Sequence, residues 1–384
     1  GHAHAPHAFA GAGVEAGGVE LDLPPFSEFT TELIERMLSH SPEWAVYQGR
    51  YEQADVVTIP DEAQRGRTLE MIDTALAELQ RYQEVDLSPA EQADYALLDN
   101  RLRSLRWYQT DLKRWQWNPA SYNVAGVINL ILNTDFAPLA DRIEIVRARL
   151  GQVPAYYAAA RANIERPTLE HLELAIVQNQ GGLRSLGEAL EAHLDEAGLD
   201  AEQRAVFMAA LTPARAAIEG WIADLEALQS ELTESGDLRP FRLGGALYEP
   251  KFAFDLQAGF TARALYERAL DEKERLLADM DEIAVSLWPE YFPDQEMPDD
   301  RLVRIGELID LLSNRHVSVD EFIPEIRRQI PELEAFVRDN NLLEQDPEKP
   351  LIVRETPEYM RGGGAIASVS APGPFNPGAE TYYN

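Results

Sequence analysis

The chain has 384 residues, a size that fits two domains or one large one, and its 45% share of apolar residues is sufficient for a substantial core. Acidic residues outnumber basic ones 66 to 34, and the resulting net charge of −32 disfavours binding to nucleic acids or to anionic lipid surfaces. The mean hydropathy is −0.31 and no run of about 18 apolar residues occurs, which predicts no membrane span, while the lack of cysteine excludes disulfides and cysteine nucleophiles.

Residues 1–24 are rich in small residues and histidine, and they lack the charged start and the apolar stretch of a signal peptide. We expect a disordered tail here. Casual binding of a metal ion by His2, His4 and His7 is the less favoured alternative.

Apolar residues recur at helical spacing from Pro25 to about residue 340. Ser88-Pro89-Ala90-Glu91 is a capping box with proline at the first helical position, and another helix is expected after Pro60-Asp61. Further helices are expected after Pro167-Thr168 with a kink at Gly181-Gly182, after Thr212-Pro213, after Thr261, and over residues 299–312 and 319–340. The short loops between them predict a large antiparallel helical array over residues 25–344.

The pattern changes at about residue 345, and residues 345–384 are expected to be rich in β-structure. Leu351-Ile352-Val353 is a β-type run, residues 365–369 alternate loosely as a strand does, and Gly362-Gly363-Gly364 is hinge-like. The fold class is therefore mainly α, with a small β-rich segment after about residue 350. Since this segment ends within a strand, its remaining partners are expected beyond residue 384.

Catalytic motifs are absent from the sequence. There is no H-E-x-x-H helix, no G-x-S-x-G elbow and no Walker loop. The histidines outside the tail, which are His40, His171, His193 and His316, also lack the Glu three residues earlier that a di-iron bundle requires. We therefore expect no metal site in this chain, and the catalytic residues stay unknown.

Two clusters each allow a functional and a structural interpretation. Trp107, Tyr108, Trp115, Trp117 and Tyr122 would line a ligand groove or form a buried aromatic core. The acidic residues between 271 and 282 would donate carboxylates to calcium or form a solvated helix face. The structural interpretation is favoured for both.

Several landmarks occur in a recognisable order. They are Arg166-Pro167, residues 175–178 with Gly182, Arg242-Leu243-Gly244 with Tyr248, Thr261-Ala262 with Leu265-Tyr266, Thr356-Pro357, Ala371-Pro372 and Tyr382-Tyr383-Asn384. In this order the chain resembles the bacterial family called domain of unknown function 885, whose members look like zinc metallopeptidases of the zincin type. The resemblance covers about residue 26 to residue 384.

The resemblance implies where the catalytic chemistry lies. In that family an aromatic–aromatic–Asn strand end is followed by a metal helix of the form H-E-x-x-x-G-H, which this chain does not contain. Zinc is therefore expected for the complete parent protein and none in this chain. Tyr382, Tyr383 and Asn384 are the candidate substrate-binding residues, either in the rim strand or beside it. One tyrosine is expected to pack on the helical core, while the other tyrosine and Asn384 face the cleft.

The resemblance also implies a function. The chain would be the N-terminal and middle part of a zinc-dependent hydrolase that acts on peptides, and it would supply the walls and rim strand of the cleft. The alternative is a non-catalytic α-helical scaffold that binds a peptide or a protein partner. The family's frequent export implies a periplasmic or cell-envelope location.

Overall fold

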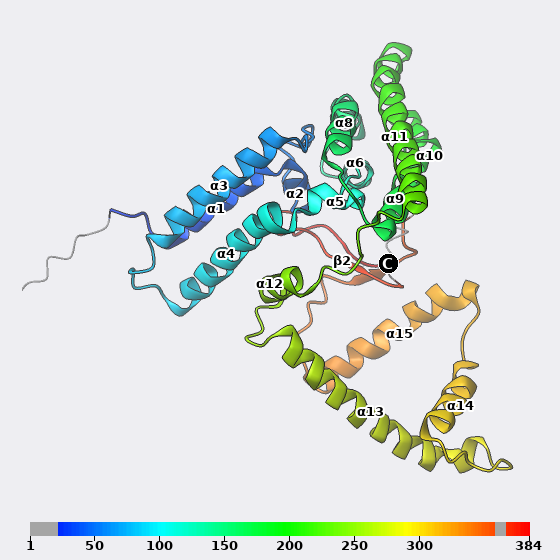
Figure 1. The fold of residues 1–384 in the computed structure, drawn as a ribbon. Coiled ribbons are helices and arrows are strands. Elements are labelled where there is room, and N and C mark those ends of the chain that lie inside the picture. Colours follow the sequence, from blue (N-terminus) through cyan, green and yellow to red (C-terminus); the bar gives the residue numbers. More distant parts are fainter. Residues whose placement is uncertain (1–21, 358–365) are drawn as a thin grey trace, which may run out of the picture.

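The chain is mainly helical, with one small sheet near its C-terminus, which confirms the predicted fold class. The computed structural model describes residues 22–357 and 366–384 (Figure 1). The three tail histidines, the Gly362–Gly364 hinge and Ala365 lie outside these ranges. Within them, no helix is both long and apolar enough to cross a membrane.

The first helical group surrounds a small core of its own. Its helices are α1 (Phe26–His40), α2 (Pro42–Tyr47), α3 (Glu62–Gln80) and α4 (Pro89–Trp107). Leu33, Ile72 and Leu102 are fully buried in this core. The predicted capping box is present, because Ser88 and Glu91 each accept the backbone N–H of the other.

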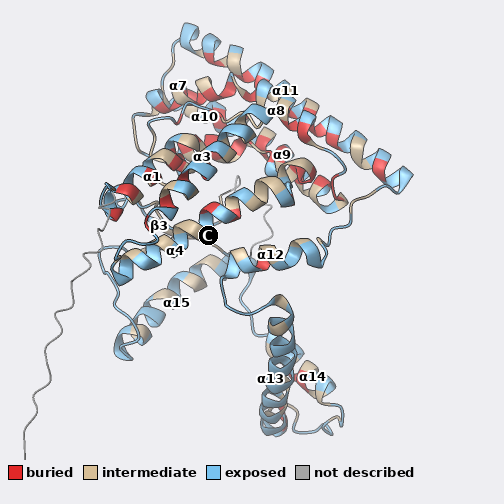
Figure 2. Cartoon of the chain, turned by 60° about the vertical axis from the view of Figure 1, so that its left-hand side comes forward, coloured by how far each residue is buried: buried red, intermediate tan, exposed pale blue. Residues whose placement is uncertain are grey.

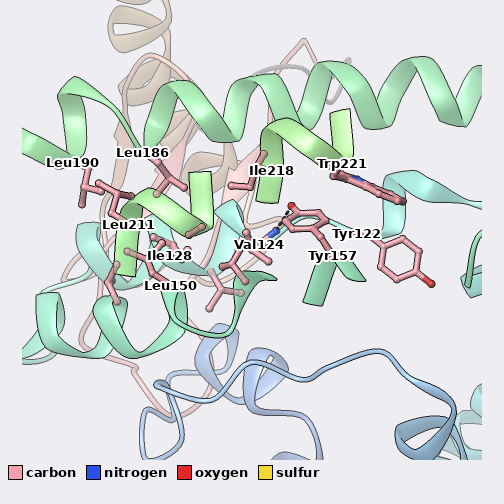
Figure 3. Close-up of a cluster of buried hydrophobic side chains, with 14 of the residues drawn as sticks. Tyr122, Val124, Ile128, Leu150, Tyr157, Leu186, Leu190, Leu211, Ile218 and Trp221 are labelled. Carbon is pink, nitrogen blue, oxygen red and sulfur yellow. Dashed lines mark hydrogen bonds between the residues drawn. The ribbon is translucent and has the colours of Figure 1, made fainter. Parts of the chain in front are cut away.

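The second helical group holds the largest core. It contains α6 (Ala125–Asn133), α7 (Leu139–Leu150), α8 (Val153–Asn163), α9 (Leu169–Ser185), α10 (Glu188–Glu196) and α11 (Ala201–Ser235). Side chains from α6, α8 and α11, among them Ile128, Tyr157 and Trp221, point toward one another (Figure 3). The buried Tyr157 hydroxyl donates to Asn179 Oδ1 at 2.6 Å, which satisfies the polar end of the ring.

Helix α11 begins earlier than the sequence analysis predicted. It starts after Asp200, not at Thr212-Pro213, and Pro213 lies inside it. Asp200 and Gln203 form a capping box that starts the helix. Phe207 and Leu211, both buried, continue its apolar face up to the proline. The cap and this buried face stabilise a helix that the proline alone would have interrupted.

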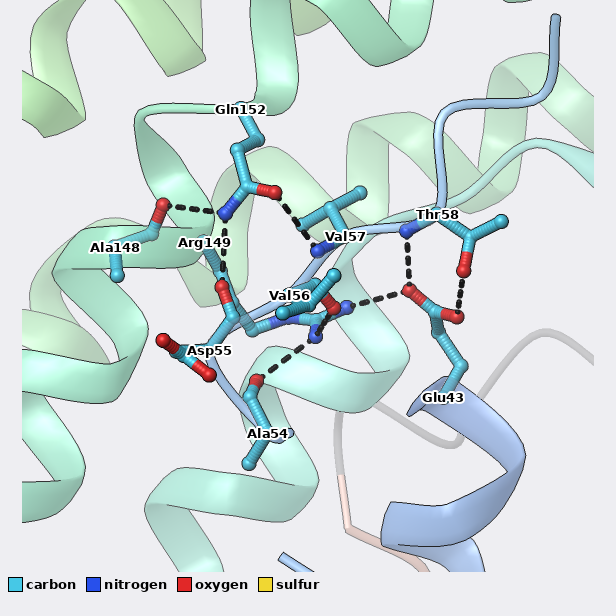
Figure 4. A network of polar contacts seen from close by, with 9 residues as sticks. All are labelled: Glu43, Ala54, Asp55, Val56, Val57, Thr58, Ala148, Arg149 and Gln152. Atoms are coloured by element: carbon cyan, nitrogen blue, oxygen red, sulfur yellow. Dashed lines mark hydrogen bonds and ion pairs between the residues drawn. The ribbon is translucent and has the colours of Figure 1, made fainter. Parts of the chain in front are cut away.

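The two groups are joined by a polar network around Arg149 of α7 (Figure 4). The buried Arg149 guanidinium donates to the carbonyls of Ala54 and Val56 at 2.9 and 2.7 Å, and it lies 3.3 Å from a carboxylate oxygen of Glu43 in α2. Gln152 accepts the backbone N–H of Val57 at 2.9 Å. The connection between α2 and α3 is thereby held against α7 and α8.

Short segments link the groups, and a long arm follows. The short segments are the π-helix η1 (Tyr108–Leu112), α5 (Arg114–Trp117) and the 3₁₀-helix η2 (Pro119–Ser121). The arm consists of α12 (Gly245–Leu256), α13 (Ala262–Tyr291), α14 (Arg301–Ser313) and α15 (Val319–Asp339). Helix α13 runs away from the helical groups, α14 and α15 return, and most of the arm's surface is exposed (Figures 1 and 2).

The acidic stretch between residues 271 and 282 lies on α13 and makes ion pairs with α14. Asp281 pairs with Arg304 at 2.5 Å, and Glu274 pairs with Arg301 at 2.7 Å. The stretch therefore contributes to holding two helices together, in keeping with the structural interpretation.

The sheet contains β1 (Leu351–Val353), β2 (Val369–Ser370) and β3 (Thr381–Tyr383) in the order β1-β3-β2. Strand β3 is parallel to β1 and antiparallel to β2. The expected alternation over residues 365–369 ends in a strand of two residues only. Since β3 occupies the centre, only β1 and β2 have an outer edge.

Candidate functional site

The three predicted substrate-binding residues lie in and directly after the central strand. Tyr382 and Tyr383 belong to β3 and are half-buried, and Asn384 follows them. Because β3 is paired on both sides, it has no free edge for a substrate. These residues can therefore lie beside a peptide-binding edge, but they cannot form one.

Asn384 is buried, and its side-chain amide ties the ends of the three strands together. Its Nδ2 donates to Ser370 Oγ at 2.8 Å and to Ser368 Oγ at 3.3 Å, both on the β2 side. Its Oδ1 accepts from Arg354 Nε at 2.7 Å, on the β1 side. This geometry assigns the amide a positioning role in the sheet, and contact of Asn384 with a cleft stays a prediction.

Arginines hold β1 and the Tyr382 ring. The Arg354 guanidinium lies 3.6 Å from the centroid of the Tyr382 ring, a cation–π distance, and the Tyr382 hydroxyl donates to Glu380. Arg327 of α15 donates to the Val353 carbonyl at 3.0 Å. The outer side of β1 is thus engaged by α15.

Within the described ranges, strand β2 is paired on one side only and presents an open edge on the other. Ser368 and Asn384 exchange both backbone hydrogen bonds, at 3.0 and 2.8 Å. In an antiparallel ladder the next pair, Val369 with Tyr383, exchanges none, so the Val369 N–H and C=O point away from β3. Among the described residues nothing bonds to these two groups, and Val369 is 61% exposed.

The segment that connects β2 to β3 is anchored on the chain after α2. The Phe375 N–H donates to the Gln48 carbonyl at 3.1 Å, and the Arg50 guanidinium lies 5.1 Å from the centroid of the Phe375 ring. A Cβ at Gly373 would overlap the Gln48 backbone, so only glycine allows this close approach. The sheet is thereby attached to the first helical group.

The described residues do not fit a zinc site. In this part of the chain no group of three or more His, Asp or Glu side chains is placed to hold a metal ion. His40 and His171 each bond a threonine hydroxyl, of Thr68 and Thr168, at 2.8 and 2.5 Å. Burial is the main cause that lowers the pKa of both imidazoles, and Arg67 and Arg114, respectively, lower it further.

The aromatic cluster of the sequence analysis divides between core and cavity. Tyr122 is buried, its hydroxyl donates to the Trp115 carbonyl at 2.5 Å, and its ring packs edge-on against Trp221. Tyr108 and Trp117 instead line a cavity of about 650 Å³. Its other walls come from α9, from the connection between α11 and α12, and from α12 itself. The sequence analysis allowed a ligand groove for these two aromatic residues but missed the other lining residues, because they are far apart along the chain.

Comparisons with known proteins give a family and a fold. The family model described as "Bacterial protein of unknown function (DUF885)" matches residues 42–384. The chain is similar to a solved structure from Shewanella oneidensis described as a putative lipoprotein of unknown function, with 44% identity and a TM-score of 0.81, over 94% of this chain and 64% of that one. A comparison with curated proteins yields no match.

A second solved structure, described as a putative lipoprotein from Colwellia psychrerythraea, shares the fold. Its TM-score is 0.65 and its identity to this chain is 13%, over 93% of this chain and 66% of that one. The chain therefore spans slightly less than two thirds of the length of either structure.

Proposed function

We propose that this chain, which belongs to the bacterial DUF885 family, forms the wall and the sheet edge of a peptide-binding cleft in a longer, peptide-hydrolysing protein. The observation that carries the proposal is the open edge of β2, where the Val369 N–H and C=O point away from the sheet. An extended peptide would add to this edge as a further strand, through main-chain hydrogen bonds. Tyr382, Tyr383 and Asn384 would lie one strand further in and support the edge.

The charge of the chain favours one class of peptide. With a net charge of −32, its surface attracts basic peptides, although salt confines this attraction to about 8–10 Å from an exposed carboxylate. Pairing with the strand edge is independent of side-chain identity. Main-chain hydrogen bonds would therefore supply the affinity, and the acidic surface would supply the preference for basic peptides.

The catalytic step is assigned outside this chain. The described residues do not fit zinc, so we infer that the zinc ligands and the general base belong to a further part of the protein. By itself the chain would bind peptides without cleaving them, which is the alternative activity of a non-catalytic scaffold.

The similarity to the solved structures supports a proposal for the location of the protein. Both similar structures are described as putative lipoproteins. We propose an exported or cell-envelope location for this protein as well, to be tested by fractionation of cells that express the complete gene. Recovery in the cytoplasmic fraction would contradict it.

A substitution at the open edge tests the proposed cleft. Val369→Pro removes the outward N–H and leaves the ladder bonds to β3 intact, whereas the matched control Val369→Thr keeps that N–H. We expect Val369→Pro to weaken binding of a short, labelled peptide of alternating threonine and lysine several-fold, measured by fluorescence anisotropy. Equal affinity of both variants, with equal melting temperatures, would show that β2 is not the binding edge.

A further inference from the structure

The charged residues that line the cavity beside α12 are basic, whereas the chain as a whole is strongly acidic. Arg114, Arg242 and Lys251 line it, and the described residues contribute no acidic side chain to its walls. Acidic residues outnumber basic ones 66 to 34 over the whole chain, so a wall with cations alone is a local exception. Such a cavity attracts an anion.

Two of the three cations are available to a ligand. Arg114 and Arg242 form no ion pair within the described part of the chain, and both are exposed at the cavity. Lys251 is paired with Asp255 at 2.5 Å. The two arginines therefore retain their forked donors, which match the geometry of a carboxylate.

Asn118 supplies an amide donor without a partner. Only 3% of this residue is exposed, and its Oδ1 accepts the Ala120 N–H at 2.9 Å, which orients the amide. Its Nδ2 has no hydrogen-bond partner among the described residues, although Asn118 lines the cavity. Nδ2 is not among the buried side-chain atoms that lack a partner, so it is accessible from the cavity and can donate to an acceptor there.

His171 adds a second donor. The Thr168 hydroxyl accepts the His171 backbone N–H at 3.2 Å and lies 2.5 Å from Nδ1. Thr168 is 1% exposed, so its hydroxyl proton needs an acceptor, and Nδ1 is the one in reach. In the neutral imidazole the proton then resides on Nε2, the nitrogen that is free to donate to a ligand.

The beginning of α12 also faces this cavity. Gly244 and Gly245 line it, no side chain caps the helix, and Gly244 has a φ of 80°, a left-handed value that favours glycine. The landmark formed by Arg242, Gly244 and Tyr248 thus lies entirely in the cavity wall.

The remaining walls are aromatic. The His171 ring stacks on Phe241 at 5.6 Å between centroids, and Trp117 meets it edge-on at 5.5 Å. Phe241 is 58% exposed and presents most of the apolar surface, whereas Trp117 is buried and the Arg239 guanidinium lies 5.0 Å from its ring centroid. The cavity therefore combines an apolar wall with donors for an anion.

We propose that this cavity binds a carboxylate carried on an aromatic body, either a free aromatic acid or the C-terminal residue of a peptide. The carboxylate would lie between Arg114, Arg242 and the Asn118 amide, and the ring would pack against Trp117 and Phe241. The volume of about 650 Å³ is in the range of small-molecule sites. This proposal does not depend on peptide hydrolysis or on the edge of β2.

Calorimetric titration of the full chain tests the required chemistry. N-acetylphenylalanine should bind. N-acetylphenylalaninamide has the same ring without the charge, and its Kd should be at least about tenfold higher. Inorganic phosphate should bind more weakly than the acid, because it has no ring. Equal affinity for the acid and the amide, or no binding of the acid, would overturn the proposal.

Substitutions locate the site. Arg242→Gln removes an exposed guanidinium and should raise the Kd for N-acetylphenylalanine about tenfold. Arg101→Gln removes an exposed arginine of α4 that does not line the cavity, and it should leave the Kd unchanged. Equal effects of the two variants would place the binding elsewhere.

A fourth ligand distinguishes the two sources of the carboxylate. Tighter binding of N-acetylglycylphenylalanine than of N-acetylphenylalanine supports a peptide C-terminus, and equal binding supports a free aromatic acid.

Discussion

Arg354 Nε donates to Asn384 Oδ1 at 2.7 Å, and this contact joins the residue after β1 to the residue after β3. The Asn384 Nδ2 simultaneously donates to Ser368, which precedes β2, and to Ser370 within it. A sheet of strands with two or three residues each has few backbone hydrogen bonds. The side-chain amide therefore contributes a large share of the polar contacts that hold the sheet.

We expect Asn384→Ala to destabilise the sheet. The substitution removes the hydrogen bonds of Asn384 to the Arg354 and Ser370 side chains, at a cost of about 1–3 kcal/mol. Asn384→Asp keeps an acceptor for Arg354 and lets the Ser370 hydroxyl donate instead, so it should retain most of the stability. Hydrogen exchange of the β3 amides measures the difference. Unchanged protection in Asn384→Ala would show that the amide does not hold the strands.

The attachment of the sheet to the first helical group depends on Gly373. In Gly373→Ala the new Cβ would overlap the Gln48 backbone, which we expect to cost about 1–3 kcal/mol and to expose the Phe375 amide. Gly378→Ala is the matched control, because a Cβ at that position meets nothing within 4 Å. Thermal unfolding and exchange of the Phe375 amide compare the two variants. Equal behaviour would contradict the close contact.

Local chemistry predicted the helices that begin at a strong cap. Ser88 with Glu91, and Thr261 before α13, begin their helices as predicted. The predicted start of α11 at Thr212-Pro213 is wrong, because the Asp200 capping box lies upstream and begins the helix. Proline marks a probable boundary only, and a buried apolar face can outweigh it.

The sheet order and the cavity depend on contacts distant in sequence. Periodicity identified β1, but nothing in the residues near Tyr382 shows that β3 becomes the central strand. Likewise, Asn118, His171 and Arg242 meet only through the packing of helices. Two local signals for this site existed. One was the aromatic cluster with Tyr108 and Trp117, for which the groove interpretation was not favoured, and the other was the spacing of Arg242, Gly244 and Tyr248, which the resemblance identified without indicating its role.

The stability of the first helical group should depend on pH through His40. Burial, followed by the charge of Arg67, holds the pKa of this imidazole below its ordinary value of 6.5. As the pH falls below about 6.5, the unfolded chain takes up the proton before the folded chain does, so the free energy of unfolding decreases. His40→Gln should remove this part of the acid sensitivity. Urea unfolding at pH 7.5, 6.5 and 5.5 measures the free energy of unfolding of both proteins. The same decrease of this free energy with falling pH in both would contradict the prediction.

Two nearby arginines of α7 allow the effect of a buried contact to be compared with that of a surface contact. Arg149 is 2% exposed, and its guanidinium satisfies the carbonyls of Ala54 and Val56. Arg147, two residues away, pairs only with Glu144 at the surface. We expect Arg149→Ala to lower the free energy of unfolding by about 3–5 kcal/mol, because the buried carbonyls and Glu43 lose their partner.

Arg147→Ala should change the free energy of unfolding by about 0.5 kcal/mol or less, because exposed ion pairs contribute little. Urea denaturation at pH 7 compares the two variants, and the exchange of the Val57 amide reports on the connection between α2 and α3. This amide donates to Gln152, so it should stay protected in Arg147→Ala and lose protection in Arg149→Ala. Loss of global stability with full protection of Val57 would assign the effect of Arg149 to packing within α7, and not to its contacts with the connection.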